Sequence, residues 1–243
     1  MLSFWKKLRA RKRGSCTALV PAAGYSSRMG GGNKLFADLC GAPVLARTLS
    51  CLQLAKRVDE IIVAAREEDL EAVSRLCREY AIDKCTKVIR GGETRAHSVL
   101  LASAEAARDA SLLAVHDGAR PLATPDLIDR VIDAAARSGA AAPALRLKDT
   151  VKRVREGGEV DRTLNRSELR AVQTPQVFDA DLLKAALHTA VEQNAPITDD
   201  CSAVERLGKT VYLLDGEEEN LKITTPLDMI FAEAVLRERM GGA

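Results

Sequence analysis

Short apolar runs alternate with longer segments of helical periodicity along most of the chain, and this alternation limits the possible folds most strongly. Several runs are apolar throughout, which is typical of strands that helices cover on both faces. Strands are expected at 16–20, 60–65, 87–90, 112–116, 140–147 and 210–214. Helices are expected at 44–57, 67–80, 93–109, 126–137, 180–193, 201–207 and 227–239. The pattern predicts a three-layer α/β fold with a largely parallel sheet.

Residues 148–172 interrupt this alternation. Two polar, strand-like stretches, 150–155 and 160–164, flank Glu156-Gly157-Gly158-Glu159, which is typical of a hairpin turn. An isolated hairpin is only marginally stable in water, so this one is expected to pack on another surface. We expect an arm that reaches across a homodimer interface. The alternative is a hairpin exposed on a monomer.

The N-terminal segment 1–15 differs in charge from the rest of the chain. It contains six basic side chains and no acidic one. The other 30 of the 36 basic residues lie in 16–243, together with all 34 acidic residues, so this main part of the chain is mildly acidic. We expect 1–15 to be a disordered tail and 16–243 to be one domain. The alternative for the tail is a weak apolar stripe (Phe4, Trp5 and Leu8) that touches an anionic membrane.

Composition excludes several classes of protein. No apolar stretch is long enough for a membrane span, and no apolar region follows the basic residues as in a secretory signal. An acidic body with 3% aromatic residues is not typical of a nucleic-acid-binding protein. The six cysteines are scattered without a Cys-x-x-Cys pair, so we expect a cytoplasmic protein without a disulfide framework.

A glycine-rich loop follows the first expected strand. It runs from Pro21 to Asn33, contains four glycines and Arg28, and is followed by Lys34. Its spacing fits neither a P-loop nor a dinucleotide-binding fingerprint. Free backbone N–H groups beside two cations are suited to a bound polyphosphate. The alternative is a surface loop with solvated basic residues.

Polar residues also follow two other expected strands. Asp117 and Arg120 come after 112–116, and the segment Gly91–Ser98 comes after 87–90. Ligands of open α/β sheets bind at the carboxyl ends of the strands, so these residues are expected near the glycine-rich loop. Asp117 is a candidate ligand for Mg²⁺, which prefers one or two carboxylates plus phosphate oxygens. The alternative is an Asp that stabilises a turn by pairing with Arg120.

Seven short motifs occur in a characteristic order. They are Pro21-Ala22-Ala23-Gly24 with Arg28-Met29 and Lys34, Gly91-Gly92-x-x-Arg95-x-x-Ser98-Val99, His116-Asp117-Gly118-Ala119-Arg120-Pro121, Lys148-Asp149-Thr150, Thr174-Pro175-Gln176, Thr198-Asp199-Asp200 and Asn220-x-Lys222-Ile223-Thr224. Together they resemble the 2-C-methyl-D-erythritol 4-phosphate cytidylyltransferases from about Cys16 to the C-terminal helix.

The resemblance implies a Rossmann-like nucleotidyltransferase fold, with CTP and methylerythritol phosphate as substrates and Mg²⁺ as cofactor. It also implies roles for individual residues. Arg28, Lys34, Arg166 and Lys222 would be catalytic, and Ala22, Ala23, Gly24, Gly92, Glu93 and Ser98 would bind CTP. Asp117, Arg120, Thr150, Arg166, Thr174 and Lys222 would bind the second substrate, and Asp117 would also hold the metal. The arm would donate Thr150 and Arg166 to the neighbouring subunit.

Two departures and two rival functions accompany the resemblance. Glu217, Glu218, Glu219 and Asn220 precede Lys222, so a second carboxylate ligand of the metal is open. Many members of the family have Pro-Lys-Gln where this chain has Asn33-Lys34-Leu35, so the path of this loop is open. The nearest rival is a cytidylyltransferase for another sugar-alcohol phosphate, such as ribitol 5-phosphate. A rival from another class is a non-catalytic nucleotide sensor or nucleic-acid-binding protein.

Overall fold

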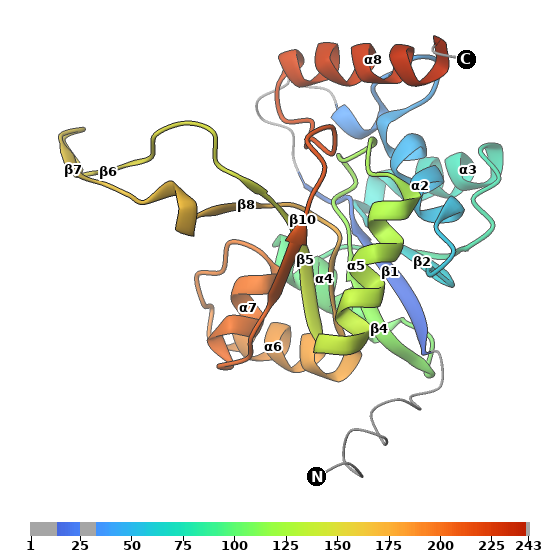
Figure 1. Ribbon diagram of the computed structural model, residues 1–243. Helices are drawn as coiled ribbons and strands as arrows, with labels where there is room; N and C mark the ends of the chain where they lie inside the picture. Colours follow the sequence, from blue (N-terminus) through green and yellow to red (C-terminus); the bar gives the residue numbers. More distant parts are fainter. Residues whose placement is uncertain (1–13, 25–32, 242–243) are drawn as a thin grey trace, which may run out of the picture.

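The computed structural model describes residues 14–24 and 33–241, and an eight-stranded sheet forms its centre (Figure 1). The strand order is β10-β5-β9-β4-β1-β2-β3, with β8 paired to β5. The strands are β1 (Ser15–Pro21), β2 (Glu60–Ala65), β3 (Cys85–Arg90), β4 (Ala110–Val115), β5 (Ala140–Arg146), β8 (Arg170–Val172), β9 (Gln176–Asp179) and β10 (Tyr212–Asp215). Only β8 and β9 run antiparallel to their neighbours, so the predicted, largely parallel sheet is confirmed.

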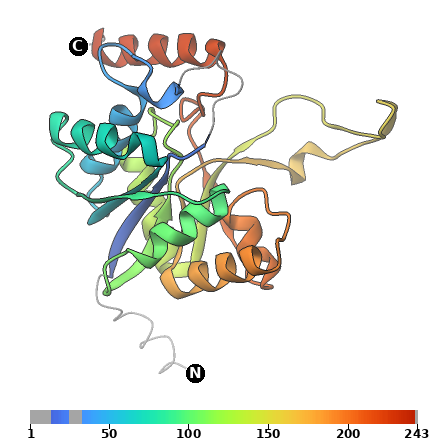
Figure 2. The same cartoon turned by 180° about the vertical axis from the view of Figure 1, so that it is seen from behind.

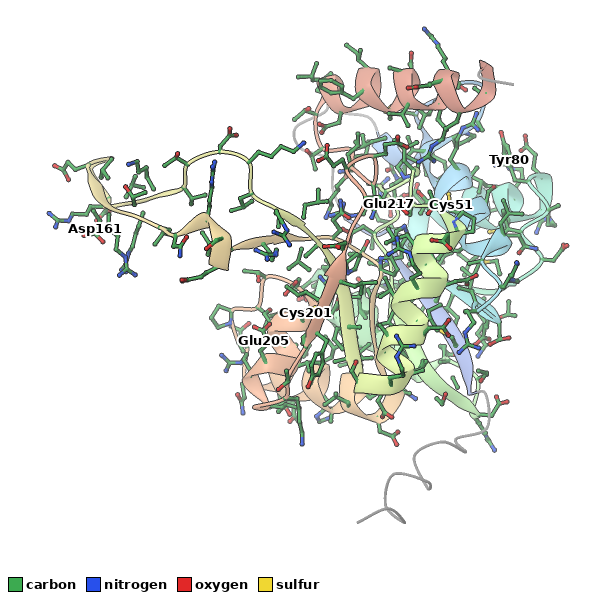
Figure 3. The ribbon with its side chains drawn as sticks, in the orientation of Figure 1. Cys51, Tyr80, Asp161, Cys201, Glu205 and Glu217 are labelled. Carbon is green, nitrogen blue, oxygen red and sulfur yellow. The ribbon has the colours of Figure 1, made fainter. Side chains whose placement is uncertain are left out.

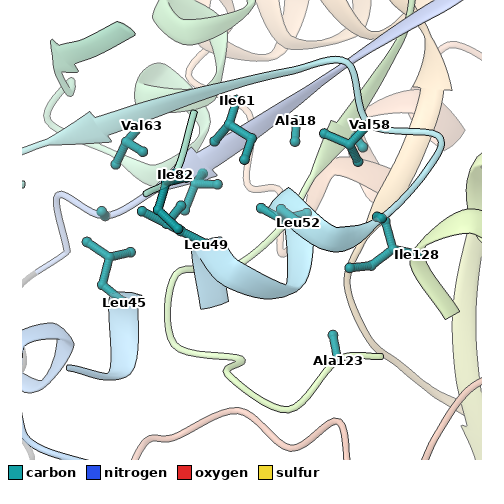
Figure 4. Close-up of a cluster of buried hydrophobic side chains, with 14 of the residues drawn as sticks. Ala18, Leu45, Leu49, Leu52, Val58, Ile61, Val63, Ile82, Ala123 and Ile128 are labelled. Carbon is teal, nitrogen blue, oxygen red and sulfur yellow. The ribbon is translucent and has the colours of Figure 1, made fainter. Parts of the chain in front are cut away.

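Helices cover both faces of this sheet. They are α2 (Val44–Leu54), α3 (Leu70–Glu79), α4 (Arg95–Ala104), α5 (Pro125–Ser138), α6 (Ala180–Glu192) and α7 (Asp200–Arg206). In β1, Ala18 and Val20 pack with α2, α3 and α5, whereas Leu19 between them packs with α4, α6 and α7. Figure 4 shows Ala18 and Ile61 in the first of these layers. Because alternate side chains point to opposite faces, a continuous apolar run completes two cores.

Helix boundaries follow the capping chemistry of the sequence. Thr124 accepts a hydrogen bond from the N–H of Leu127 at 3.1 Å, and Pro125 is the first residue of α5. Gly139 ends the same helix with φ of 85°, a conformation that glycine adopts without strain. α8 (Pro226–Gly241) begins directly after Thr225 and crosses one end of the molecule (Figure 1). A small third core holds α8 there through Ala232 and Leu236.

A two-stranded hairpin leaves the body as an arm. β6 (Lys152–Val154) pairs with β7 (Val160–Thr163) as predicted, and every residue of both strands is exposed. The arm projects away from the sheet in both views (Figures 1 and 2). Figure 3 shows Asp161 on this arm, well apart from Cys51 and Glu217 in the body. Within residues 14–24 and 33–241, the two strands of the arm are therefore not covered by the body.

Three predictions fall partly or wholly outside this description. Arg28 and most of the glycine-rich loop lie outside the described residues, as do residues 1–13 of the expected tail.

No helix within residues 14–24 and 33–241 has the length and apolar character needed to cross a membrane.

Candidate active site

A cavity of about 860 Å³ opens at the carboxyl ends of β1, β2, β3 and β4. The chain adds β2 and β3 on one side of β1 and then returns to place β4 on the other side. Such a reversal separates the loops that follow neighbouring strands and leaves a crevice between them. The sheet therefore builds the cavity where the sequence predicted a ligand.

Most of the predicted site residues line this cavity. Its walls include Ala22, Ala23, Gly24, Lys34, Gly92, Glu93, Ser98, Asp117 and Lys222. Arg120 and Thr174 lie buried beside it, at 9% and 4% exposure. Thr150 and Arg166 lie at the base of the arm, outside the cavity wall. One crevice thus gathers segments that extend from Pro21 to Lys222 in the sequence.

The loops after β1 and β3 contact each other closely at one end of the cavity. A Cβ atom added to Gly91 would lie 2.7 Å from the Cβ of Ala23 and 2.9 Å from the Oγ of Ser98. The N–H of Gly92 donates to the Ser98 hydroxyl at 3.0 Å, and this hydroxyl lies 2.9 Å from the carbonyl oxygen of Thr94. Ser98 is buried and fixes the glycine turn, and both glycines of the turn line the cavity.

Lys34 is anchored at both its backbone and its ammonium group. It begins the short helix η2 (Lys34–Phe36), whose first turn Asn33 caps by accepting from the N–H of Leu35 at 3.2 Å. The Nδ2 of Asn33 also donates to Asp69 at 2.9 Å. The ammonium group of Lys34 donates to the carbonyl oxygen of Ile223 at 2.8 Å. The departure from the family pattern at Asn33 therefore has a structural function: the side chain caps η2 and links it to Asp69.

Three cations surround the carboxylate of Asp117. Lys222 Nζ lies 2.9 Å from its Oδ2, Arg95 Nε lies 3.2 Å from its Oδ1, and Arg120 Nε lies 3.6 Å from its Oδ2. Burial alone would raise the pKa of this carboxyl, but Arg95 and Lys222 hold the pKa well below its ordinary value. Asp117 is therefore ionised at neutral pH and orients positively charged groups in the cavity.

Thr174 and His116 fix the backbone that presents Asp117. The N–H of Asp117 donates to the Thr174 hydroxyl at 3.1 Å, and the hydroxyl lies 3.0 Å from Nδ1 of His116. Burial lowers the pKa of His116 to about 4, so its imidazole is neutral at pH 7. With Nδ1 accepting from Thr174, Nε2 donates to the carbonyl oxygen of Arg120 at 3.3 Å. The hydroxyl of Thr174 is thus engaged inside the protein.

The donor set around Asp117 does not fit a metal ion held by the protein alone. Both carboxylate oxygens already face cationic nitrogens. Across residues 14–24 and 33–241, no three His, Cys, Asp or Glu side chains are grouped so as to hold a metal ion. Mg²⁺ usually takes only one or two carboxylates and completes its shell with phosphate oxygens and water. The predicted Mg²⁺ requirement therefore stays a prediction, with phosphate oxygens as its best ligands.

Sequence reasoning missed Arg95, Asp200 and the interaction of Asn33 with Asp69. Arg95 belongs to the motif that begins at Gly91, but the spacing of that motif does not indicate that the Arg95 side chain contacts Asp117. Asp200 likewise stands in Thr198-Asp199-Asp200, and its burial depends on how α7 packs. These contacts join segments that are distant in sequence, and hydrophobic periodicity predicts helices and strands but not such contacts.

The comparisons agree on one family. A family model for 2-C-methyl-D-erythritol 4-phosphate cytidylyltransferase matches residues 16–238. The enzyme of that name from Halalkalibacterium halodurans is 41% identical over 224 residues, which cover 92% of this chain and 97% of the relative. The one from Dehalococcoides mccartyi (strain 195) is 42% identical over 221 residues, covering 91% and 96%.

Solved structures of proteins with this activity in their names also resemble the fold. The 4-diphosphocytidyl-2C-methyl-D-erythritol synthase of Anaerococcus prevotii superimposes with a TM-score of 0.82 at 31% identity, over 93% of this chain and 100% of that one. The 2-C-methyl-D-erythritol 4-phosphate cytidylyltransferase of Thermus thermophilus gives 0.75 at 34% identity, over 92% and 99%. The similarity to both structures therefore extends over more than nine tenths of this chain.

Proposed function

Because the chain belongs to the 2-C-methyl-D-erythritol 4-phosphate cytidylyltransferase family, we propose that it transfers the cytidylyl group of CTP to 2-C-methyl-D-erythritol 4-phosphate. The products are 4-diphosphocytidyl-2-C-methyl-D-erythritol and pyrophosphate, in the non-mevalonate route to isoprenoid precursors. An oxygen of the substrate phosphate forms a bond to the α-phosphorus of CTP. The bond from that phosphorus to the bridging oxygen breaks, and its electron pair leaves with pyrophosphate.

The observation that supports this function most strongly is the composition of the cavity. Its lining combines glycine-rich backbone, at Ala22–Gly24 and Gly91-Gly92, with the charged side chains of Lys34, Asp117 and Lys222. A nucleobase and ribose need close backbone approach, whereas two phosphate groups that meet need cations. The cavity provides both.

Fixed cations are the main catalytic contribution that this site offers. Two anions must approach each other while charge builds on the α-phosphorus, and positioning with electrostatic stabilisation is enough for such a reaction. Lys34 faces the cavity from η2, and Lys222 and Arg120 are held by Asp117. We assign Lys34 to the triphosphate and Lys222 with Arg120 to the methylerythritol phosphate. The assignment of Arg28 to the triphosphate stays a prediction.

Mg²⁺ remains part of the proposal as a companion of CTP. Because both oxygens of Asp117 already face cations, phosphate oxygens are the better ligands for a metal that enters with the nucleotide. Bound there, the ion would neutralise charge on the leaving pyrophosphate.

We propose that the arm completes the site of a second copy of the chain. Thr150 and Arg166 lie outside this chain's own cavity wall, and the arm projects away from the body (Figures 1 and 2). Val154 and Val160, which pair across the hairpin, are 57% and 59% exposed and form a small apolar surface on the arm. A symmetric exchange of arms would cover them and bring Thr150 and Arg166 to the partner's methylerythritol phosphate.

We also propose that the protein works in the cytoplasm. All six cysteines are free thiols, as expected for a protein in a reducing compartment. Detection of the native protein in the cytoplasmic fraction of its source cells, without a membrane-bound fraction, would support this location.

The test of the function is pyrophosphate release from CTP by the purified chain with Mg²⁺ present. Release is expected with methylerythritol 4-phosphate, and much less of it with ribitol 5-phosphate or with no acceptor. Faster release with ribitol 5-phosphate would change the assigned substrate. Tight CTP binding without release for either acceptor would favour the nucleotide sensor.

A further inference from the structure

A buried carboxylate beside the cavity has no part in the reaction described so far. Asp200, the first residue of α7, has no exposed surface. Its Oδ2 accepts a hydrogen bond from Nη1 of Arg95 at 2.7 Å, while its Oδ1 is buried without a hydrogen-bond partner among the described residues. An ion pair taken out of water adds little net stability, so packing alone does not explain this carboxylate.

Arg95 connects Asp200 to the reaction site. It is the first residue of α4, it lines the cavity, and its Nε donates to Asp117 Oδ1 at 3.2 Å. One planar guanidinium therefore links the start of α7 to the loop after β4. Because its donors form a rigid fork, the contact with Asp200 restricts the direction from which Arg95 reaches Asp117.

The sheet in turn fixes the position of Asp200. The N–H groups of Asp200 and Cys201 both donate to Gln176 Oε1 at 3.0 Å, and Gln176 Nε2 donates to Asp199 at 2.8 Å. Gln176 is the buried first residue of β9, between β4 and β5 in the sheet. Asp200 is thus attached to a rigid element, as a group that positions others needs to be.

The negative charge of Asp200 also balances the cations of the site. Three cations, Arg95, Arg120 and Lys222, surround the two carboxylates of Asp117 and Asp200. If Asp200 became neutral, Arg95 would lose its anchor and the same cations would share one negative charge. Repulsion would then favour displacement of Arg95 or Lys222, the two cations with the more exposed side chains.

We propose that Asp200 and Arg95 are positioning residues for the transfer reaction. Asp200 fixes Arg95, Arg95 fixes the carboxylate of Asp117, and Asp117 then presents Lys222 and Arg120 to the methylerythritol phosphate in one geometry. The inference rests on the proposed function, because Lys222 and Arg120 are assigned to that substrate there.

The test uses the isosteric variant Asp200→Asn in the full-length protein. A displacement of about 1 Å at a reacting group costs roughly 100-fold in rate, so kcat/KM for methylerythritol phosphate is expected to fall about 10- to 100-fold. The dissociation constant of CTP and the midpoint of thermal unfolding are expected to change little. A purely structural role would instead lower the unfolding midpoint and weaken both substrates alike.

Two further variants keep the test decisive. Arg95→Lys retains the charge but cannot bridge two carboxylates, so it is expected to give the same substrate-specific loss even if Asp200→Asn folds poorly. The double variant is expected to be no worse than the more damaging single change, because both break one link. The matched control is Asp133→Asn, which removes another 2.7 Å Arg–Asp pair, with Arg57, outside the cavity wall. It is expected to leave both substrates unaffected.

Turnover of the wild-type protein in the same assay distinguishes failure of the proposed function from failure of the positioning role. If the wild type does not turn over, the proposed function fails. If it does, the positioning role is overturned when kcat/KM for methylerythritol phosphate stays within twofold of wild type in Asp200→Asn or Arg95→Lys. Equal loss for both substrates, or losses that multiply in the double variant, would also overturn it.

Discussion

At the scale of single residues, the site depends on side chains held by several partners rather than on one reactive group. Asp117 is the clearest case, since its carboxylate contacts Lys222 and Arg95 while its N–H is bound by Thr174. Lys34 is fixed in the same way, through Asn33 and Ile223. A transfer reaction without a covalent intermediate needs this kind of fixed charge.

Loss of the Lys34 ammonium should therefore reduce the chemical step strongly. We expect Lys34→Ala to lower kcat by about 10²- to 10³-fold, as for other preorganised donors, because the transition state loses one fixed positive charge. Steady-state pyrophosphate release measures this, and circular dichroism checks that the variant is folded. A loss below threefold would contradict the assignment of Lys34.

The close contact at Gly91 predicts a defect in nucleotide binding. In Gly91→Ala, the new methyl group would lie 2.7 Å from the Ala23 Cβ, so one of the two loops must move. We expect CTP to bind at least about tenfold more weakly, because loop backbone that approaches a ligand tolerates little displacement. Calorimetric titration with CTP measures this. Unchanged affinity would show that the turn does not contact the nucleotide.

At the scale of elements, the arm has no evident function within a single copy of the chain. β6 and β7 are wholly exposed, and the predicted substrate ligands Thr150 and Arg166 flank them. If two chains exchange arms, each site contains Lys34 from one chain and Arg166 from the other.

Mixing two inactive variants tests this exchange. Lys34→Ala and Arg166→Ala are each expected to be nearly inactive alone. After mixing and reassociation, half of the dimers are mixed and hold one intact site each, so about a quarter of wild-type turnover per chain should return. No recovery in a mixture that sedimentation shows to contain dimers would place Arg166 in its own chain's site.

Elements also show which parts of the fold the sequence could predict. All six expected strands form. Where the apolar run is continuous, as in 60–65, its side chains fill both cores at β2, whereas β3 and β10 at the two edges of the sheet are largely exposed. The apolar pattern does not predict β8 and β9, because they are short and each has only two consecutive apolar residues, Ala171-Val172 and Val177-Phe178. Pro175 lies between β8 and β9 and so interrupts no pairing.

The site was predictable to a similar degree. Loops that follow parallel strands must meet at one edge, so the juxtaposition of the glycine-rich loop with Gly92 and Asp117 followed from the strand order. The links through Arg95 and Asp200 did not, because they depend on side-chain directions at the starts of α4 and α7.

At the scale of the whole molecule, buried polar groups of the site also govern stability against acid. Burial lowers the pKa of His116 in the folded protein to about 4 from an ordinary value of 6.5. The unfolded chain therefore binds more protons between these values, and folding weakens as the pH falls. The lowered pKa of Asp117 extends the same trend below its ordinary value of 3.8.

Unfolding free energy should accordingly fall by up to about 3 kcal/mol between pH 6.5 and pH 4 through His116 alone. Urea titrations at both pH values measure this, and His116→Asn should show a smaller difference between them. A free energy of unfolding that is equal at both pH values, or larger at pH 4, would contradict a neutral, buried His116.

The central claim is that this cavity joins a cytidylyl group to a sugar-alcohol phosphate. Phosphorus NMR of one reaction mixture tests it most directly, because every phosphorus atom can be followed. With CTP, methylerythritol 4-phosphate and Mg²⁺, the account predicts one cytidine-linked diphosphate ester for each pyrophosphate released. Pyrophosphate that accumulates with CMP while methylerythritol phosphate remains unchanged would contradict it.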